Sequence, residues 1–149
     1  MGAWNYQILC DDVALDVIEE LEELDESEDM VRALNIHFDN ALAKPEYIEY
    51  TEGVSALTCA ALIDAAINGI ELALLTDNEE AEEAEQAEAL AEQIAELNLF
   101  ELRDKAIASL ELVISDGSEI NELWGENEEL YPLWMGNVHA VMERLRRSN

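Results

Sequence analysis

The sequence predicts an all-α fold, a single-domain bundle of six or seven helices with an apolar central helix at about residues 54–75. Apolar residues recur at helical spacing in nearly every long segment. Half of the 149 residues are hydrophobic, which is enough apolar surface for one sizeable core. Strand patterns are short: only residues 47–50 alternate, residues 4–9 could be extended, and neither has a clear partner. We therefore treat residues 1–149 as one acidic helical domain.

The first two expected helices have one apolar face each. In the first, Asp11 or Asp12 is expected to be the N-cap, and the apolar stripe comprises Ala14, Val17, Ile18, Leu21 and Leu24. The second runs over about 29–43 and ends at Lys44-Pro45, because a residue before proline avoids the helical region. Its stripe comprises Met30, Leu34, His37, Phe38 and Ala41.

Residues 54–75 are apolar on almost every side and rich in alanine, which places this helix at the centre of the bundle. Asp64, Asn68, Gly69 and Glu71 interrupt the run and disfavour a membrane span. Further helices are expected over 79–96 and 98–115, with a short helix capped by Ser118. Pro132 suits the first turn of a last helix, whose C-terminal dipole Arg144, Arg146 and Arg147 complement.

The charge is strongly one-signed, with 36 Asp and Glu against 7 Lys and Arg and a formal net charge of −29. Contact with nucleic-acid phosphates needs clustered basic residues, and an anionic membrane repels such a chain. The composition thus predicts a cationic protein as partner, with no direct nucleic-acid or membrane binding. Cys10 and Cys59 are too few and too distant for a disulfide framework or a zinc site, and no secretory signal is evident. We expect a cytoplasmic location.

Little in the sequence suggests catalysis. His37 and His139 lie on or beside apolar helical faces, which favours structural roles over general-base roles. No activated nucleophile or phosphate-binding glycine loop is evident. The EF-hand pattern fails after Asp77, where Glu82 stands at the glycine position, and fails at Asp116-Gly117. We expect no enzyme activity, no cofactor and no metal.

The most acidic segment is 79–96, and it has no basic residue. It can be a solvated face, but like-charge pairs four residues apart, such as Glu88 with Glu92, destabilise a helix. That cost favours a role in binding. The predicted partner-binding residues are Glu79, Glu80, Glu82, Glu83, Glu85 and Glu88. Four aromatic residues are possible anchors or, alternatively, core residues: Tyr47, Tyr50, Trp124 and Tyr131.

Three regions resemble a small bacterial family, domain of unknown function 4259. Residues 1–4, Met-Gly-Ala-Trp, and residues 11–16, Asp-Asp-x-Ala-Leu-Asp, are similar to its N-terminal motif. Residues 49–66 have its acidic lead into an alanine-rich helix, and 118–124 are similar to its Ser-Glu-Leu-x-x-Leu-Trp region. Some relatives look like immunity genes beside polymorphic or contact-dependent toxins, which is the function that the resemblance implies.

These observations predict a cytoplasmic immunity protein, an antitoxin-like inhibitor that covers the active-site cleft of a cationic toxin. A nuclease is the expected toxin, because its cleft must be basic to hold phosphates. The alternative is a DNA-mimic regulator, whose carboxylates would imitate a phosphate track and block a DNA-binding host protein. A large secreted protein with a basic C-terminal domain, encoded immediately upstream, would favour immunity.

Overall fold

The computed structural model describes residues 12–24, 26–43, 46–68, 92–95 and 100–147. These residues are almost entirely helical, and no strand occurs among them, so the all-α prediction is confirmed. The helices are α1 (Asp12–Glu22), α2 (Ser27–Leu42), α3 (Tyr50–Asn68), α5 (Phe100–Val113), α6 (Glu119–Gly125) and α7 (Tyr131–Arg147), with a short helical segment at 92–94. None of the described helices is long and apolar enough to cross a membrane.

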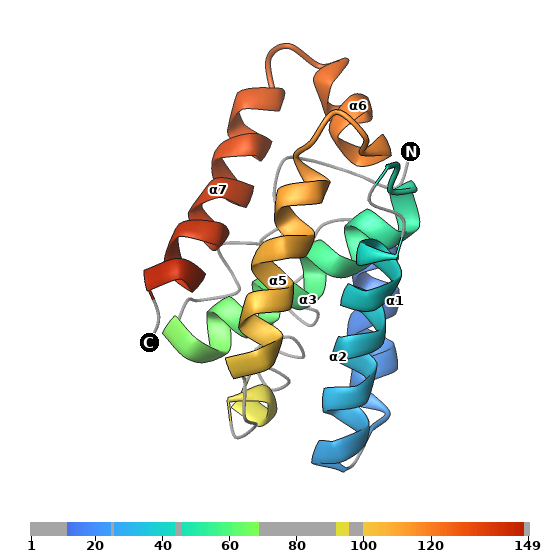
Figure 1. Cartoon of the computed structure of the whole chain (residues 1–149), viewed down its shortest axis with the longest axis vertical. Coiled ribbons are helices and arrows are strands. Elements are labelled where there is room, and N and C mark those ends of the chain that lie inside the picture. The colour runs from blue at the N-terminus through green and yellow to red at the C-terminus, as the bar shows by residue number, and fades with distance from the viewer. Residues whose placement is uncertain (1–11, 25, 44–45, 69–91, 96–99, 148–149) are drawn as a thin grey trace.

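Helix α3 is the centre of the bundle, as its sequence predicts. It contacts α1, α2, α5, α6 and α7, and every residue from 53 to 65 is buried. Figure 1 shows it crossing behind α5, with α1 and α2 on one side and α7 on the other. The helix begins at Tyr50, four residues before the predicted start, because the carboxylate of Glu119 accepts the Tyr50 N–H at 2.9 Å. Residues 69–75 of the predicted helix lie outside the described residues.

The outer helices bury most of the apolar residues on their predicted stripes, whereas Leu24 and His37 are only partly buried. On α1, Val17, Ile18 and Leu21 are at most 3% exposed; Asp11, one of the two predicted N-caps, lies outside the described residues. On α2, the buried residues are Met30, Leu34, Phe38 and Ala41. The last helix, α7, has Pro132 in its first turn, as predicted, and buries Trp134, Val138, Val141, Met142 and Leu145.

The segment that precedes α3 pairs with the turn that precedes α6. Ile48 and Ser118 form an isolated parallel bridge, in which Ile48 N–H donates to the Gly117 carbonyl at 2.7 Å. The Glu119 N–H donates in return to the Ile48 carbonyl at 2.9 Å. Ser118 is the N-cap of α6, as predicted, and its side chain accepts from the Asn121 N–H at 3.3 Å. Residues 47–50 therefore do have an extended partner, but only through this one bridge.

Helices α3 and α7 are joined by a buried charge. The Asp64 side chain is fully buried, and its two oxygens accept from Arg144 Nε and Asn68 Nδ2, each at 2.7 Å. Burial raises the pKa of Asp64, and the hydrogen bonds from Asn68 and Arg144 oppose that rise. Arg144 is one of the three arginines predicted to complement the dipole of the last helix. It has a second role here, because it also neutralises the buried carboxylate of Asp64.

We expect Gly117→Ala to destabilise the fold, because an added Cβ would lie 2.5 Å from the Glu46 carbonyl oxygen. Neither backbone can yield without disturbing the Ile48–Ser118 bridge. The free energy of unfolding in urea should fall by about 1–3 kcal/mol. The control is Gly136→Ala within α7, where nothing lies within 4 Å of the new Cβ. That variant should gain about 0.5–1 kcal/mol from helix propensity. Equal changes in the free energy of unfolding for the two variants would contradict the close packing of Gly117 against Glu46.

We expect Arg144→Met to be far more destabilising, by about 3–5 kcal/mol, because it leaves a buried carboxylate without its counterion. The double variant Asp64→Leu with Arg144→Met should be more stable than Arg144→Met alone, because the stranded charge is gone. Lowering the pH should also reduce the loss in Arg144→Met, since protonation neutralises Asp64. Arg147→Met is the control: that arginine side chain is 80% exposed and should matter by no more than about 0.5 kcal/mol. If Arg144→Met lost the same free energy of unfolding at every pH, the unpaired charge of Asp64 could not be the cause of that loss.

Candidate functional site: an acidic surface

The described residues offer little for chemistry. No group of three or more His, Cys, Asp or Glu among them is arranged to hold a metal ion. Cys59 is fully buried in α3, and burial raises the pKa of its thiol, so the thiolate that a nucleophile requires is suppressed. His37 lies half-buried on α2, with Nε2 3.3 Å from a carboxylate oxygen of Glu20 on α1, which fits the predicted structural role.

His139, unlike His37, is not packed against the core. This residue is exposed on α7, because it follows the buried Val138 by one position and so points about 100° away around the helix. It lies beside the apolar face rather than on it.

Each Lys and Arg among the described residues is engaged with a carboxylate of the same chain. The pairs are Arg32–Asp29 (3.2 Å), Arg103–Asp104 (3.7 Å), Lys105–Asp39 (2.9 Å), Arg144–Asp64 (2.7 Å), Arg146–Glu111 (3.1 Å) and Arg147–Glu143 (3.5 Å). These pairs lie on α2, α5 and α7 or join them to α3. The large excess of carboxylates elsewhere is therefore not neutralised by the described cations.

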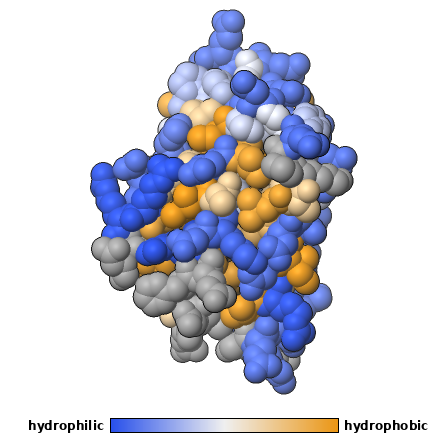
Figure 2. All heavy atoms as spheres, in the orientation of Figure 1, coloured by the Kyte–Doolittle hydropathy of each residue, from blue (hydrophilic) through white to orange (hydrophobic). Residues whose placement is uncertain are grey.

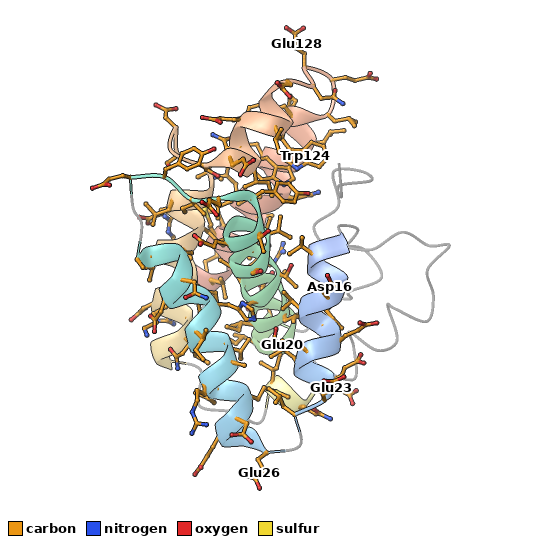
Figure 3. The ribbon with its side chains drawn as sticks, turned by 90° about the vertical axis from the view of Figure 1, so that its right-hand side faces the viewer. Asp16, Glu20, Glu23, Glu26, Trp124 and Glu128 are labelled. Carbon is orange, nitrogen blue, oxygen red and sulfur yellow. The ribbon has the colours of Figure 1, made fainter. Side chains whose placement is uncertain are left out.

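One group of such carboxylates, which we call the α1 acidic face, comprises the exposed residues Asp16, Glu19, Glu20, Glu22, Glu23 and Glu26. Figure 3 shows Asp16, Glu20, Glu23 and Glu26 following one another along α1 into the turn before α2. Burial, and then the charge of Glu19, raise the pKa of Glu22. Of the described Lys, Arg and His side chains, the imidazole of His37 contacts this face, with Nε2 3.3 Å from Glu20.

A second group, the α6 acidic end, lies at the opposite end of the molecule, where Figure 3 labels Glu128. Its exposed carboxylates are Glu46, Glu49, Glu122, Glu126, Glu128 and Glu129. The chain has no Lys, Arg or His at residues 46–53 or 112–138, the two segments that build this end. On the face shown in Figure 2, hydrophilic residues cover the upper end of the molecule, and hydrophobic residues gather nearer its middle.

Three of the four candidate aromatic anchors belong to the packed interior. Trp124 is 6% exposed and stacks on Trp134, with ring centroids 5.9 Å apart. Tyr131 also stacks on Trp134 and donates to the Asn121 side-chain oxygen at 2.6 Å, and Tyr50 packs against the core. Tyr47 is different, because it is 41% exposed within the α6 acidic end.

The predicted binding residues Glu79, Glu80, Glu82, Glu83, Glu85 and Glu88 lie outside the described residues. Their assignment stays a prediction. The sequence reasoning missed the α6 acidic end, although the absence of any basic residue over 112–138 was a signal that could have revealed it. It had no comparable signal for the pairing of Asp64 with Arg144, which are 80 residues apart.

We expect the fold to become more stable with added NaCl and toward mildly acidic pH. Salt screens repulsion among the unpaired carboxylates. The raised pKa of Glu22 and of Asp64 means that the folded chain binds protons more tightly than the unfolded chain. Stability is therefore gained as the pH falls from neutral through those folded-state pKa values. Urea unfolding at several NaCl concentrations and pH values tests this, with Glu19→Gln/Glu23→Gln expected to weaken the salt dependence. Stability that falls with salt would contradict the expectation.

Comparison with known proteins gives one finding. The family model described as "Domain of unknown function (DUF4259)" matches residues 2–137. No curated protein and no solved structure matches the chain. The match includes both the N-terminal motif and the Ser118–Trp124 region on which the resemblance rests. The chain therefore belongs to the DUF4259 family of domains of unknown function.

Proposed function

We propose that this protein is a cytoplasmic immunity protein, an antitoxin-like inhibitor of a cationic toxin nuclease from a contact-dependent or polymorphic toxin system. The observation that supports this most is the division of charge. The described cations are engaged within the chain, whereas the α1 acidic face and the α6 acidic end are rich in exposed carboxylates. A surface of this kind favours capture of a basic partner.

Inhibition of this type needs no chemistry from the inhibitor. A nuclease cleft carries Lys and Arg side chains that hold phosphates, and a carboxylate-covered surface can occupy the same cleft. The summed field accelerates encounter, while buried apolar anchors supply most of the affinity. In this proposal the protein is not an enzyme, binds no cofactor, and acts where the nucleic acid of its own cell must be protected.

A DNA-mimic regulator remains the second candidate, and the α1 acidic face is the observation that favours it. Asp16, Glu20 and Glu23 follow one another down α1 in Figure 3, and Glu26 lies below them, so that negative charges succeed one another along this side of the molecule. A mimic would bind DNA-binding proteins of unrelated systems, whereas an immunity protein would be selective for its cognate toxin.

The deciding experiment uses the C-terminal domain of a large secreted protein encoded immediately upstream. With the purified domain acting on a nucleic-acid substrate, we expect cleavage to stop at one equivalent of the inhibitor. A basic nuclease from an unrelated system is the matched control and should stay active. Inhibition of both nucleases would favour the mimic, and full activity of the cognate domain with excess inhibitor would overturn the proposal.

The predicted role of residues 79–88 is tested by replacing Glu80, Glu83 and Glu85 with Gln. This change keeps side-chain size and removes three charges. Association with the toxin domain should slow several-fold at low salt, and the effect should shrink at high salt as screening removes the steering force. Stopped-flow fluorescence measures the rate.

The matched control for this triple variant removes three charges elsewhere, through Asp29→Asn, Glu111→Gln and Glu143→Gln. These carboxylates are paired with Arg32, Arg146 and Arg147 in the described chain. A purely global charge effect would slow both variants equally, and an unchanged rate in the first would remove residues 79–88 from the binding surface.

A further inference from the structure

The geometry points to Tyr47 as the aromatic anchor for the cationic partner, where its exposed ring receives an arginine side chain beside the carboxylates of Glu49 and Glu122. This inference rests on the proposed function and names the contact that would hold the complex together. It also assigns a chemistry to the partner, because the side chain that docks on Tyr47 must be cationic and able to stack on a ring.

Tyr47 has the exposure that an anchor needs. The described large hydrophobic residues that are exposed are Ile36, Tyr47, Ile67 and Leu133, and Tyr47 is the aromatic one among them. Aromatic side chains, tyrosine included, are enriched among the few residues that dominate binding energy at protein interfaces. A tyrosine left 41% exposed at the end of a bundle that buries Trp124 and Trp134 is therefore available to a partner.

The backbone below this ring is fixed before any partner arrives. On one side of Tyr47, Ile48 is fully buried and hydrogen-bonds Gly117 and Glu119 through its own N–H and carbonyl. On the other side, the Glu46 carbonyl packs so closely on Gly117 that no Cβ would fit between them. Preorganisation of this kind reduces the conformational entropy that binding would otherwise cost.

The surroundings of the ring favour a cation. The Tyr47 hydroxyl interacts with the Glu122 carboxylate, and Glu119 and Glu49 are close enough to influence it. A phenol is neutral and keeps its hydrogen-bond donor at physiological pH, and desolvation, followed by these carboxylates, raises the pKa of Tyr47 further from that range. The segments around it, 46–53 and 112–138, supply no Lys, Arg or His of their own.

Arginine fits this position better than lysine. Its planar guanidinium can stack on the Tyr47 ring and at the same time donate two hydrogen bonds to a carboxylate such as Glu122 or Glu49. Lysine offers a compact charge without that planar match. Arginine is also a residue that nuclease clefts use to hold phosphates. The side chain that docks on Tyr47 could therefore be one of the cleft's own phosphate-binding arginines.

The test measures dissociation of the complex with the same upstream-encoded toxin domain. Tyr47→Ala should dissociate at least about 10-fold faster, with little change in the association rate, because an anchor acts after encounter. Tyr47→Phe keeps the ring and should remain within about 3-fold of the parent. The control is Ile36→Ala, which removes another exposed side chain, on α2, where Arg32 and, from α5, Lys105 lie among the carboxylates. Its dissociation rate should not change.

The outcomes separate the two proposals. If the unmodified protein does not bind the toxin domain, the proposed function fails and the anchor fails with it. If it binds, but Tyr47→Ala dissociates at the parental rate, the anchor alone is overturned. Equal urea midpoints for the variants show that folding is intact. Amide hydrogen exchange of the unmodified complex gives an independent measure, with new protection expected at 46–49 and 117–122; no protection there would also overturn the anchor.

Discussion

The enclosure of α3 is the constraint on which the rest of the structure depends. A helix with 13 consecutive buried residues must satisfy every polar group inside the protein. Thr58 does so by donating to the Val54 carbonyl at 2.8 Å, and Asp64 does so by recruiting Asn68 and, from another helix, Arg144. The surrounding helices therefore have to supply both an apolar lining and one well-placed cation.

The same enclosure explains how an extreme net charge coexists with an ordinary core. Because α3 takes the centre, the amphipathic helices can direct their charged faces outward. The described lysines and arginines lie on α2, α5 and α7, whereas the exposed carboxylates of α1 and α6 have no lysine or arginine on their own helix. Repulsion among those carboxylates opposes folding, and a fold that keeps them despite that cost is consistent with selection on the surface.

Local signals predicted much of this fold, and tertiary contacts decided the rest. The long apolar run correctly predicted a central helix, and Ser118 and Pro132 correctly marked two helix starts. The Asp64–Arg144 pair and the Ile48–Ser118 bridge join residues 80 and 70 positions apart, a separation that no short-range pattern encodes. For the same reason, composition could not tell that Trp124 packs inward while Tyr47 remains exposed. His139 shows how one position on a helix separates an exposed side chain from the buried Val138.

The burial of Cys59 makes its thiol a probe of how often the helix bundle opens. Its thiol is fully enclosed by the helices around α3 and is held in the unreactive protonated form. An alkylating reagent can reach it only when the bundle opens, so the labelling rate in a Cys10→Ser background reports how often α3 is uncovered. Any molecule that binds the closed form would slow that labelling in proportion to its affinity and concentration. The thiol of Cys59 thereby makes partner binding measurable without a tag on the surface.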